Sequence, residues 1–480
     1  MSLLLFCIET SLFDGVRAVI LNIHGKSRLL YLKNVYLKFN KVMEKSAIDR
    51  IMAPVSRFIH LEYTSGIVLL ISVVVAIIWA NSAYHDFYEH LWHINFSIGF
   101  DNFMLTHPLH IWINDGLMAV FFFVIGLELK REFMEGELSS LKKASLPMTA
   151  ALGGMLVPAL IYFAINKGTE ASHGWGIPMA TDIAFALALL SMASKHIPVS
   201  IKVFLSALAV ADDLGAVLVI AFFYTAEINF VALGIGVGFL LLLIAGNGMG
   251  IRNSLFYLII GFGVWIGFLL SGVHATIAGV LVAFTIPAVT KINEVIYSDN
   301  LRKLSYDFQE DIPEKGSLIT PKQNVTIQRV KSLSMAAETP LQTIEHALHP
   351  WVAFVIMPLF ALANAGIVIG ADFFTSIVNP VSIGVAAGLI VGKFAGILLF
   401  CWIMVKLGLA SLPEEANWKH VAGVALLAGI GFTMSLFISG LAFKNPVFID
   451  QAKYGILIAS VFAGIMGTLV LRRIGKSSVN

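Results

Sequence analysis

The chain repeatedly presents apolar stretches of about 20 residues, the length that an α-helix needs to cross the hydrocarbon of a bilayer. Because lipid offers the backbone no hydrogen-bond partners, each such stretch is expected to span as a helix. The stretches centre on Val74, Val120, Leu156, Ala186, Asp213, Leu240, Val264, Val280, Phe360, Lys393, Gly431 and Ala463. The pattern predicts an all-α integral membrane protein with about 12 transmembrane helices.

The composition agrees with a membrane protein and excludes several other classes. Apolar residues make up 58% of the 480 residues and charged residues 13%, whereas soluble proteins carry roughly 25% charged residues. The net charge of +2 gives no basis for binding nucleic acid. Cys7 and Cys401 are too few for a disulfide framework or a thiolate metal site. We therefore expect neither an ordinary cytoplasmic enzyme nor a cofactor.

The basic residues predict the orientation in the bilayer. With the N-terminus inside, 28 of the 32 basic residues fall on inward segments, 3 on outward segments, and Lys393 within a span. An excess of this size predicts that both termini are cytoplasmic. The predicted organisation is a cytoplasmic N-terminal extension (1–60), helices 1–8 (61–290), a cytoplasmic loop (291–345), helices 9–12 (346–473) and a cytoplasmic tail (474–480).

Two of these segments lie outside the membrane body. The extension has basic residues interleaved with aliphatic and tyrosine residues, which is typical of a helix lying on an anionic inner leaflet. An equally open interpretation is that the extension is disordered, or that residues 1–42 are not translated and the protein starts at Met43. The segment 291–345 is polar and charged, and we expect a long, mobile loop.

Ionisable residues inside the spans are the strongest indication of function. Asp182 lies in the fourth span, Asp212 and Asp213 in the fifth, and Lys393 in the tenth, while Asp115 lies near the outer end of the second. A charge at mid-membrane costs about 2.5–3.5 kcal/mol on insertion scales, so such residues face each other or a wet cavity. A single ion pair that only fixes packing is the structural alternative. Three aspartates against one lysine favour a pocket for a small cation or protons.

The adjacent pair Asp212 and Asp213 suggests how such a pocket works. Neighbouring helical residues point about 100° apart, so one carboxylate can lean toward Lys393 while the other faces the cavity. Burial and a nearby carboxylate favour the protonated form of a carboxyl group, and an ammonium favours the ionised form. Such a group can hold a proton at neutral pH and release it when a cation arrives. Competition between a proton and Na+ for one carboxylate is the chemistry that an exchanger requires.

Two spans also contain helix breakers at corresponding places. The fourth carries Pro178 before Thr181-Asp182, and the eleventh carries Gly429-Ile430-Gly431 before Thr433 and Ser435. Interrupted helices in corresponding positions of two halves predict an inverted-topology repeat whose unwound backbone lines the binding site. Simple loosening of helix packing by proline and glycine is the alternative. In the repeat, Asp182 would offset the N-terminal helix ends and Lys393 the C-terminal ends.

These motifs resemble the NhaA-type bacterial Na+/H+ antiporters over roughly residues 58–473. That family is itself an example of inverted repeats, so the repeat and the resemblance are not independent. The resemblance rests on Trp112-Ile-Asn-Asp115, Gly126-Leu-Glu128-Leu-Lys-Arg131-Glu132, Ala180-Thr181-Asp182-Ile-Ala-Phe-Ala186, Ala211-Asp212-Asp213-Leu-Gly-Ala216, Ser271-Gly-Val-His-Ala-Thr276, Glu345-His346 with His349-Pro-Trp351, Gly392-Lys393, and Gly431-Phe-Thr-Met-Ser435.

The resemblance implies a pH-regulated, electrogenic Na+(Li+)/H+ antiporter that expels cytoplasmic Na+ and brings in two protons per Na+. It implies that Asp212 and Asp213 bind Na+ and exchange protons, that Thr181 and Asp182 line the helix crossing, and that Lys393 pairs with an aspartate or carries protons. It places Asp115 at the outer mouth. It further implies a bacterial inner (plasma) membrane location, a role in salt tolerance and a homodimer.

A second region implied by the resemblance responds to pH. It comprises Glu128, Arg131, Glu132, Glu345, His346 and His349, at the cytoplasmic ends of the second and ninth spans. Histidine suits this role because its ordinary pKa is about 6.5, although histidines at i and i+3 near a membrane surface are also common interfacial residues. Gln342 and Thr343 stand where relatives carry basic residues, and the preceding loop is longer, so regulation is expected to differ.

Three other classes of protein also place charges in membranes. An intramembrane aspartyl protease would hold its carboxylates on separate helices about 3 Å apart, without a central lysine. A lysine at the depth of the aspartates would oppose permeation through a cation channel. An ion-coupled symporter of a small solute would need more hydrogen-bonding side chains than Thr181, Thr433 and Ser435 provide. The symporter is the alternative that we retain.

Overall fold

The computed structural model describes residues 64–100, 103–193, 197–225, 228–310, 318–370 and 377–477. The predicted N-terminal extension lies outside these residues. The described elements are α4 (Thr64–Ala80), α5 (His85–His93), β1 (Asn95–Phe100), β2 (Phe103–Pro108), α6 (Leu109–Ile111), η1 (Trp112–Leu117), α7 (Met118–Met134), α8 (Leu141–Asn166), η2 (Glu170–Met179), α9 (Ile183–Ala193), α10 (Val199–Phe223), α11 (Phe230–Gly248), α12 (Ser254–Ser271), α13 (Ala275–Thr285), α14 (Glu294–Glu310), α15 (Pro321–Ala337), α16 (Pro340–Trp351), η3 (Val352–Ile356), α17 (Met357–Asn364), α19 (Pro380–Ala387), η4 (Gly388–Gly392), α20 (Lys393–Lys406), α21 (Trp418–Leu427), α22 (Phe432–Ala442) and α23 (Pro446–Ser477).

The predicted all-α membrane class is confirmed. Within the described residues, eight helical stretches are long and apolar enough to span a bilayer, and up to eleven if each bent helix pair counts as one span. Every predicted centre lies in a helix except Gly431, which lies at the break between α21 and α22. The apolar helix α13 has only 11 residues, shorter than a full span. The count of about twelve therefore stays a prediction.

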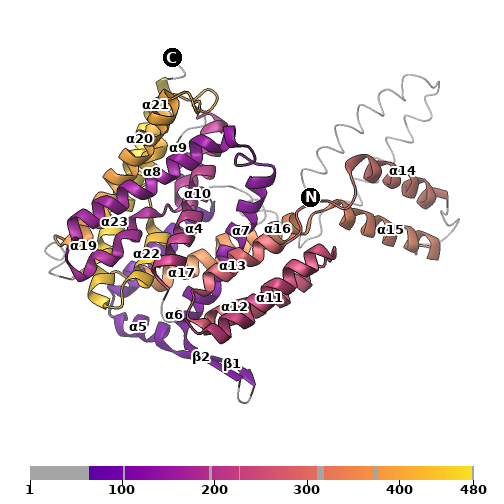
Figure 1. The fold of residues 1–480 in the computed structure, drawn as a ribbon, viewed down its shortest axis with the longest axis horizontal. Helices are drawn as coiled ribbons and strands as arrows, with labels where there is room; N and C mark the ends of the chain where they lie inside the picture. Colours follow the sequence, from indigo (N-terminus) through magenta and orange to yellow (C-terminus); the bar gives the residue numbers. More distant parts are fainter. Residues whose placement is uncertain are drawn as a thin grey trace. The chain divides into compact units, whose positions relative to one another are not determined.

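Both predicted interruptions are present, and each lies in a span bounded by longer helices. In one half, α8 is followed by the bent pair η2 and α9 and then by α10; in the other, α19–α20 is followed by the bent pair α21 and α22 and then by α23. The bends are 42° and 48°. The helices α8 and α20 lie side by side, as Figure 1 shows. This repeated order of long, broken and long helices is the one that an inverted repeat predicts.

A second group of helices packs beside these repeats. The helix α7 lies along α13, and α11 lies along α12 (Figure 1). The Nζ atom of Lys130, near the end of α7, donates to the carbonyl oxygens of Phe284 at 2.7 Å and Ile286 at 2.5 Å. A cation at these carbonyls satisfies the C-terminal end of α13. The short helix is thereby held against α7.

Two parts of the described chain differ from the expected pattern. Residues Asn95–Phe100 and Phe103–Pro108 form an antiparallel hairpin, pairing Asn95 with Pro108 and Phe100 with Phe103. The segment 291–345, expected as a loop, contains α14, α15 and the start of α16. A capping box at Thr320 and Gln323 with proline at the first turn starts α15, a signal that polarity alone does not give.

Candidate functional site

The two broken helices cross at their interruptions. The backbone N–H of Asp182 donates to the carbonyl oxygen of Ile430 at 2.6 Å, which joins the break after η2 to the break after α21. Gly431 allows this approach, because a Cβ atom there would lie 2.8 Å from the carbonyl oxygen of Ala180. Contacts that short are not found for real side chains, so the crossing requires glycine.

Asp182 satisfies the ends of both inner half-helices. One carboxylate oxygen accepts from the backbone N–H of Phe185 at 3.2 Å, and the other accepts from the N–H of Thr433 at 3.1 Å and from its hydroxyl group. These donors lie in the first turns of α9 and α22, where the helix dipoles are positive. The carboxylate thus compensates the two N-terminal ends, as the sequence predicts.

Lys393 pairs with Asp212 rather than with Asp213. Its Nζ atom forms an ion pair with Asp212 Oδ2 and donates to Thr181 Oγ1 at 2.9 Å. Thr181 Oγ1 lies 2.6 Å from Asp212 Oδ2 and 3.0 Å from the carbonyl oxygen of Ala428, at the end of α21. All three side chains are fully buried. The end of η4, just before Lys393, packs closely on α8, since a Cβ on Gly392 would lie 2.7 Å from Pro158 Cα.

Asp213 has the opposite surroundings. Its side chain is fully buried, and within the described residues neither of its carboxylate oxygens has a hydrogen-bond partner. Asp212 Oδ1 is also without one. A buried ionised carboxylate without a partner is costly, so it binds a proton or a cation. The site therefore offers free oxygen ligands, which are the kind that hard alkali cations prefer.

Asp213 lines a cavity that we call the polar cavity, because carboxylate, hydroxyl and basic groups lie among its apolar lining residues. The cavity has a volume of about 430 Å³. Asp213, Asp182 and Thr433 line one part of it, while Glu128 and His349 line another. The buried carboxylate and groups of α7 and α16 therefore line the same cavity.

The ionisable cluster of α7 and α16 is built around Arg131. Its guanidinium forms an ion pair with buried Glu345 and lies 3.6 Å from the carboxylate of Glu132. His349 Nδ1 lies 3.5 Å from Glu128 Oε1, and the imidazole side chain is 63% exposed. His346 is exposed, and no polar partner for it is found in the described parts of the chain. Five of the six residues predicted for the pH-responsive region are thus brought together.

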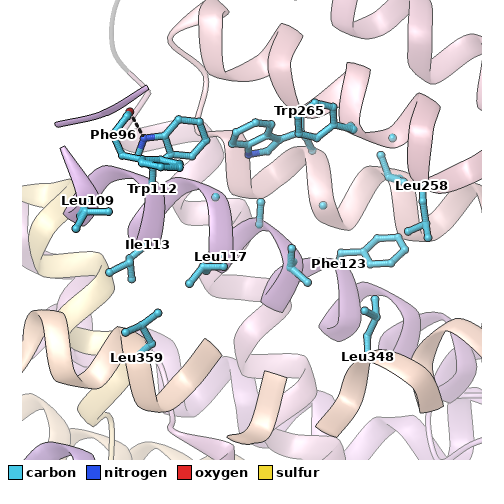
Figure 2. A pocket seen from close by; sticks show the side chains of 18 of the residues that line it. Phe96, Leu109, Trp112, Ile113, Leu117, Phe123, Leu258, Trp265, Leu348 and Leu359 are labelled. Atoms are coloured by element: carbon cyan, nitrogen blue, oxygen red, sulfur yellow. Dashed lines mark hydrogen bonds between the residues drawn. The ribbon is translucent and has the colours of Figure 1, made fainter. Parts of the chain in front are cut away.

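A second cavity, of about 610 Å³, has no ion-binding character. It is lined by apolar and aromatic residues of η1, α7, α12, α13, α16 and α17, including Trp112, Leu117, Phe123, Leu258 and Trp265 (Figure 2). No carboxylate, amine or imidazole lies in its lining. Nothing in it could replace the water around Na+, and it takes no part in the candidate site.

Asp115 stands apart from the buried aspartates. It lies in the π-helical segment η1 and is half-buried, and its carbonyl oxygen accepts from the indole of Trp265 at 3.0 Å. It does not line the polar cavity.

Sequence reasoning did not assign a role in the site to Thr433, although its motif pointed to the region. Only the fold reveals that the backbone N–H and the hydroxyl group of Thr433 donate to Asp182.

Comparison with known proteins agrees with this site. The model of the Na+/H+ antiporter 1 family matches residues 56–471. The chain is 49% identical over 421 residues to a Na+/H+ antiporter NhaA 2 of Syntrophotalea carbinolica, covering 88% of this chain and 96% of the relative. It is 47% identical over 426 residues to the NhaA of Oleidesulfovibrio alaskensis, covering 88% and 95%. The chain belongs to the NhaA family of Na+/H+ antiporters.

Membership of the NhaA family has direct consequences for the class of protein. Members are secondary transporters, so the chain is a transporter and not an enzyme. The family and the apolar helices together make it a multi-pass bacterial membrane protein. The resemblance read from the motifs is thereby confirmed over nearly the whole described chain.

A substitution at Gly431 tests whether exchange depends on the close crossing of the two broken helices. Gly431→Ala would force apart the backbones at Ala180 and Gly431, so we expect Na+/H+ exchange to fall by about 10-fold or more, as for other small displacements of an active geometry. Gly440→Ala, in the helix α22 that starts directly after Gly431, is the matched control, because a Cβ there meets nothing within 4 Å. The initial rate in proteoliposomes measures both. Equal rates for the two variants would contradict a tight functional crossing.

Proposed function

We propose that this chain is an electrogenic Na+(Li+)/H+ antiporter that expels cytoplasmic Na+ in exchange for external protons, two for each Na+. The observation that carries the proposal is Asp213, a fully buried carboxylate without a described hydrogen-bond partner, beside the Asp212–Lys393 pair and open to a polar cavity. The names of the relatives, all Na+/H+ antiporters, support the same chemistry.

Competition between the ions couples the two movements. When Asp213 is protonated, its side chain is uncharged and attracts a cation only weakly. When the proton leaves, Asp213 and the free oxygen of Asp212 can bind Na+ or Li+. Since one carboxylate cannot hold both at full strength, each ion displaces the other. Loss of a second proton from the Asp212–Lys393 pair would make the exchange electrogenic.

The direction of the cavity agrees with uptake of Na+ from the cytoplasm. Arg131 and Lys202 line it at the ends of helices that join basic segments. The excess of basic residues on these segments supports a cytoplasmic position, with both termini on the same side. We place the chain in the inner membrane, with this face of the structure open to the cytoplasm.

A vesicle assay tests the proposal directly. Everted membrane vesicles are acidified by respiration, and a pH-sensitive dye follows the collapse of the gradient after Na+, Li+ or K+ is added. We expect Na+ and Li+ to release protons and K+ to have little effect, and a membrane potential to alter the rate. No proton movement with Na+ at any pH would refute antiport.

The symporter of a small solute is less well supported than antiport. The polar cavity is lined mainly by apolar residues around a few carboxylate, hydroxyl and basic groups, and a solute pocket normally offers several convergent hydrogen-bonding groups.

We also propose a homodimer, as the resemblance implies. The mass of the purified protein in detergent, measured by light scattering, tests it.

We further propose that the Arg131 cluster regulates exchange with pH. Protonated His349 attracts Glu128, and this attraction is lost when rising pH removes the proton from the imidazole. The change occurs at the mouth of the cavity that leads to Asp213. A shift of charge there can therefore alter access of Na+ to the site.

His349→Ala should shift the pH profile of exchange without abolishing transport. The substitution removes the pH-dependent attraction to Glu128, so we expect activity at low pH to approach that at higher pH. His346→Ala is the control, because the exposed imidazole has no recorded polar partner in the described chain. Exchange rates from pH 6 to 9 are compared for both. Identical profiles for His349→Ala and the native chain would remove His349 from the proposed regulation.

A further inference from the structure

Two asparagines join the second and ninth spans on the side away from the polar cavity's basic groups. Asn114 Nδ2 donates to Asn364 Oδ1 at 3.2 Å, and Asn364 Nδ2 donates to Asn114 Oδ1 at 2.9 Å. The second N–H of Asn364 reaches the carbonyl oxygen of Phe360 at 3.0 Å. The pair is half-buried, so separating the two amides leaves polar groups without partners at a cost.

A layer of four phenylalanines lies next to this pair. Phe122 contacts Phe121 and Phe437 with ring centroids 5.2 and 5.6 Å apart, and Phe437 lies 6.2 Å from Phe360. All four side chains are at most 4% exposed. Phe360 precedes Asn364 by about one helical turn. Phe360 and Asn364 share α17, and Phe121 and Phe122 lie on α7, which continues from the η1 segment of Asn114. Phe437 reaches the layer from α22.

The phenylalanine layer borders the cavity that Asp213 lines. Phe121 lines that cavity, together with Met357 and Met434, while Phe122, Phe360 and Phe437 do not. Asn114 and Asn364 are also absent from its lining. Phe121 therefore borders this cavity, and the ring of Phe122 packs against it on the side that does not line the cavity.

The helices that carry the asparagine pair contain irregular turns suited to movement. Asn114 lies within the π-helical segment η1, and the π-helical segment η3 directly precedes α17, which ends at Asn364. A π-helical turn holds one residue more than an α-helical turn and is frequent at functional sites. Small rotations or shifts of helices at such points are an established form of switching.

We propose that the Asn114–Asn364 pair is the latch of the outer gate: it holds the phenylalanine layer closed in the cytoplasm-open state and opens when the ion leaves to the outside. The latch rests on the proposed function and on the orientation given above. The two amides do not bind the ion; they position the rings that separate Asp213 from the outer surface.

A reversible bridge across the pair tests the latch. Asn114→Cys and Asn364→Cys are combined in a chain with Cys7→Ser and Cys401→Ser. Two hydrogen-bonded amides hold their Cβ atoms farther apart than the roughly 3.5–4.5 Å of a disulfide, so the thiols are joined with an ethylene-spaced bis-methanethiosulfonate. Bridging is verified by mass spectrometry. We expect Na+/H+ exchange in proteoliposomes to fall by about 20-fold or more, because opening gates turnover, and to recover when reductant removes the bridge.

Calorimetry of Na+ binding separates a gate from a structural contact. The bridged protein in detergent should still bind Na+, because the cavity on the cytoplasmic side stays open. Each single-cysteine variant, treated with the same reagent, should keep most of its own untreated rate. A verified bridge that leaves exchange unchanged, or that abolishes Na+ binding as well, would overturn the latch. Absence of exchange in the native chain would instead refute the proposed function.

Discussion

Asp213→Asn is expected to reduce Na+/H+ exchange to the background of empty liposomes while the protein still folds. The substitution keeps the size of the side chain but removes the negative charge for which Na+ and protons compete. Folding should be preserved, because neither carboxylate oxygen has a hydrogen-bond partner in the described structure to lose. Removing a buried charge without a partner should leave the melting temperature unchanged or raise it. Exchange is measured by dye-monitored proton flux, and folding by gel filtration and thermal melting.

The matched control is Asp450→Asn. Asp450 lies near the start of α23, is 59% exposed and pairs with Lys453 at 3.3 Å. Exposed pairs of this kind contribute about 0–1 kcal/mol, so exchange should stay near the native rate. A folded Asp213→Asn variant that exchanges as fast as Asp450→Asn would show that the ion binds elsewhere.

Lys393→Met is expected to have the largest effect on stability. It removes the ammonium from a fully buried ion pair and leaves Asp212 with only Thr181 as a described partner. Breaking a buried pair in this way costs about 3–5 kcal/mol. The measurement is the melting temperature in detergent, which should fall clearly below that of the native protein.

Two further variants show whether the ion pair causes this loss. In the double variant Lys393→Met with Asp212→Asn, no charge remains unpaired, and most of the stability should return. Lys406→Met, on the same helix, removes an exposed ammonium that lies 4.4 Å from the Trp402 ring, and should cost less than about 1 kcal/mol. If the double variant melted no higher than Lys393→Met, the pair would not be the source of the instability.

Much of the site was predictable because charges in lipid leave few alternatives. The cost of burying Asp212, Asp213 and Lys393 predicts that they come together, and the helix breakers predict where the two interrupted spans lie. The different positions of the two adjacent aspartates, one paired with Lys393 and the other facing the cavity, also follow from the 100° turn between them. These inferences need only local patterns and the membrane as solvent.

Other features depend on tertiary contacts that sequence patterns do not encode. The pairing of Lys393 with Asp212 rather than Asp213 joins residues 181 positions apart and depends on how α20 lies relative to α10. The two bonds from Thr433 to Asp182 join residues 251 positions apart. The Asn114–Asn364 pair joins residues 250 positions apart, and no motif at Asn364 indicates that it contacts Asn114. Each requires the packed helices to be known.

The most direct test of competition at Asp213 is the number of protons released when Na+ binds to the purified protein. Na+ is added in weakly buffered detergent solution with a pH indicator, across a pH series, and Asp213→Asn serves as the blank. The account predicts proton release on Na+ addition in the native protein and none in the variant. Na+ binding to the native protein without proton release at any pH would contradict it.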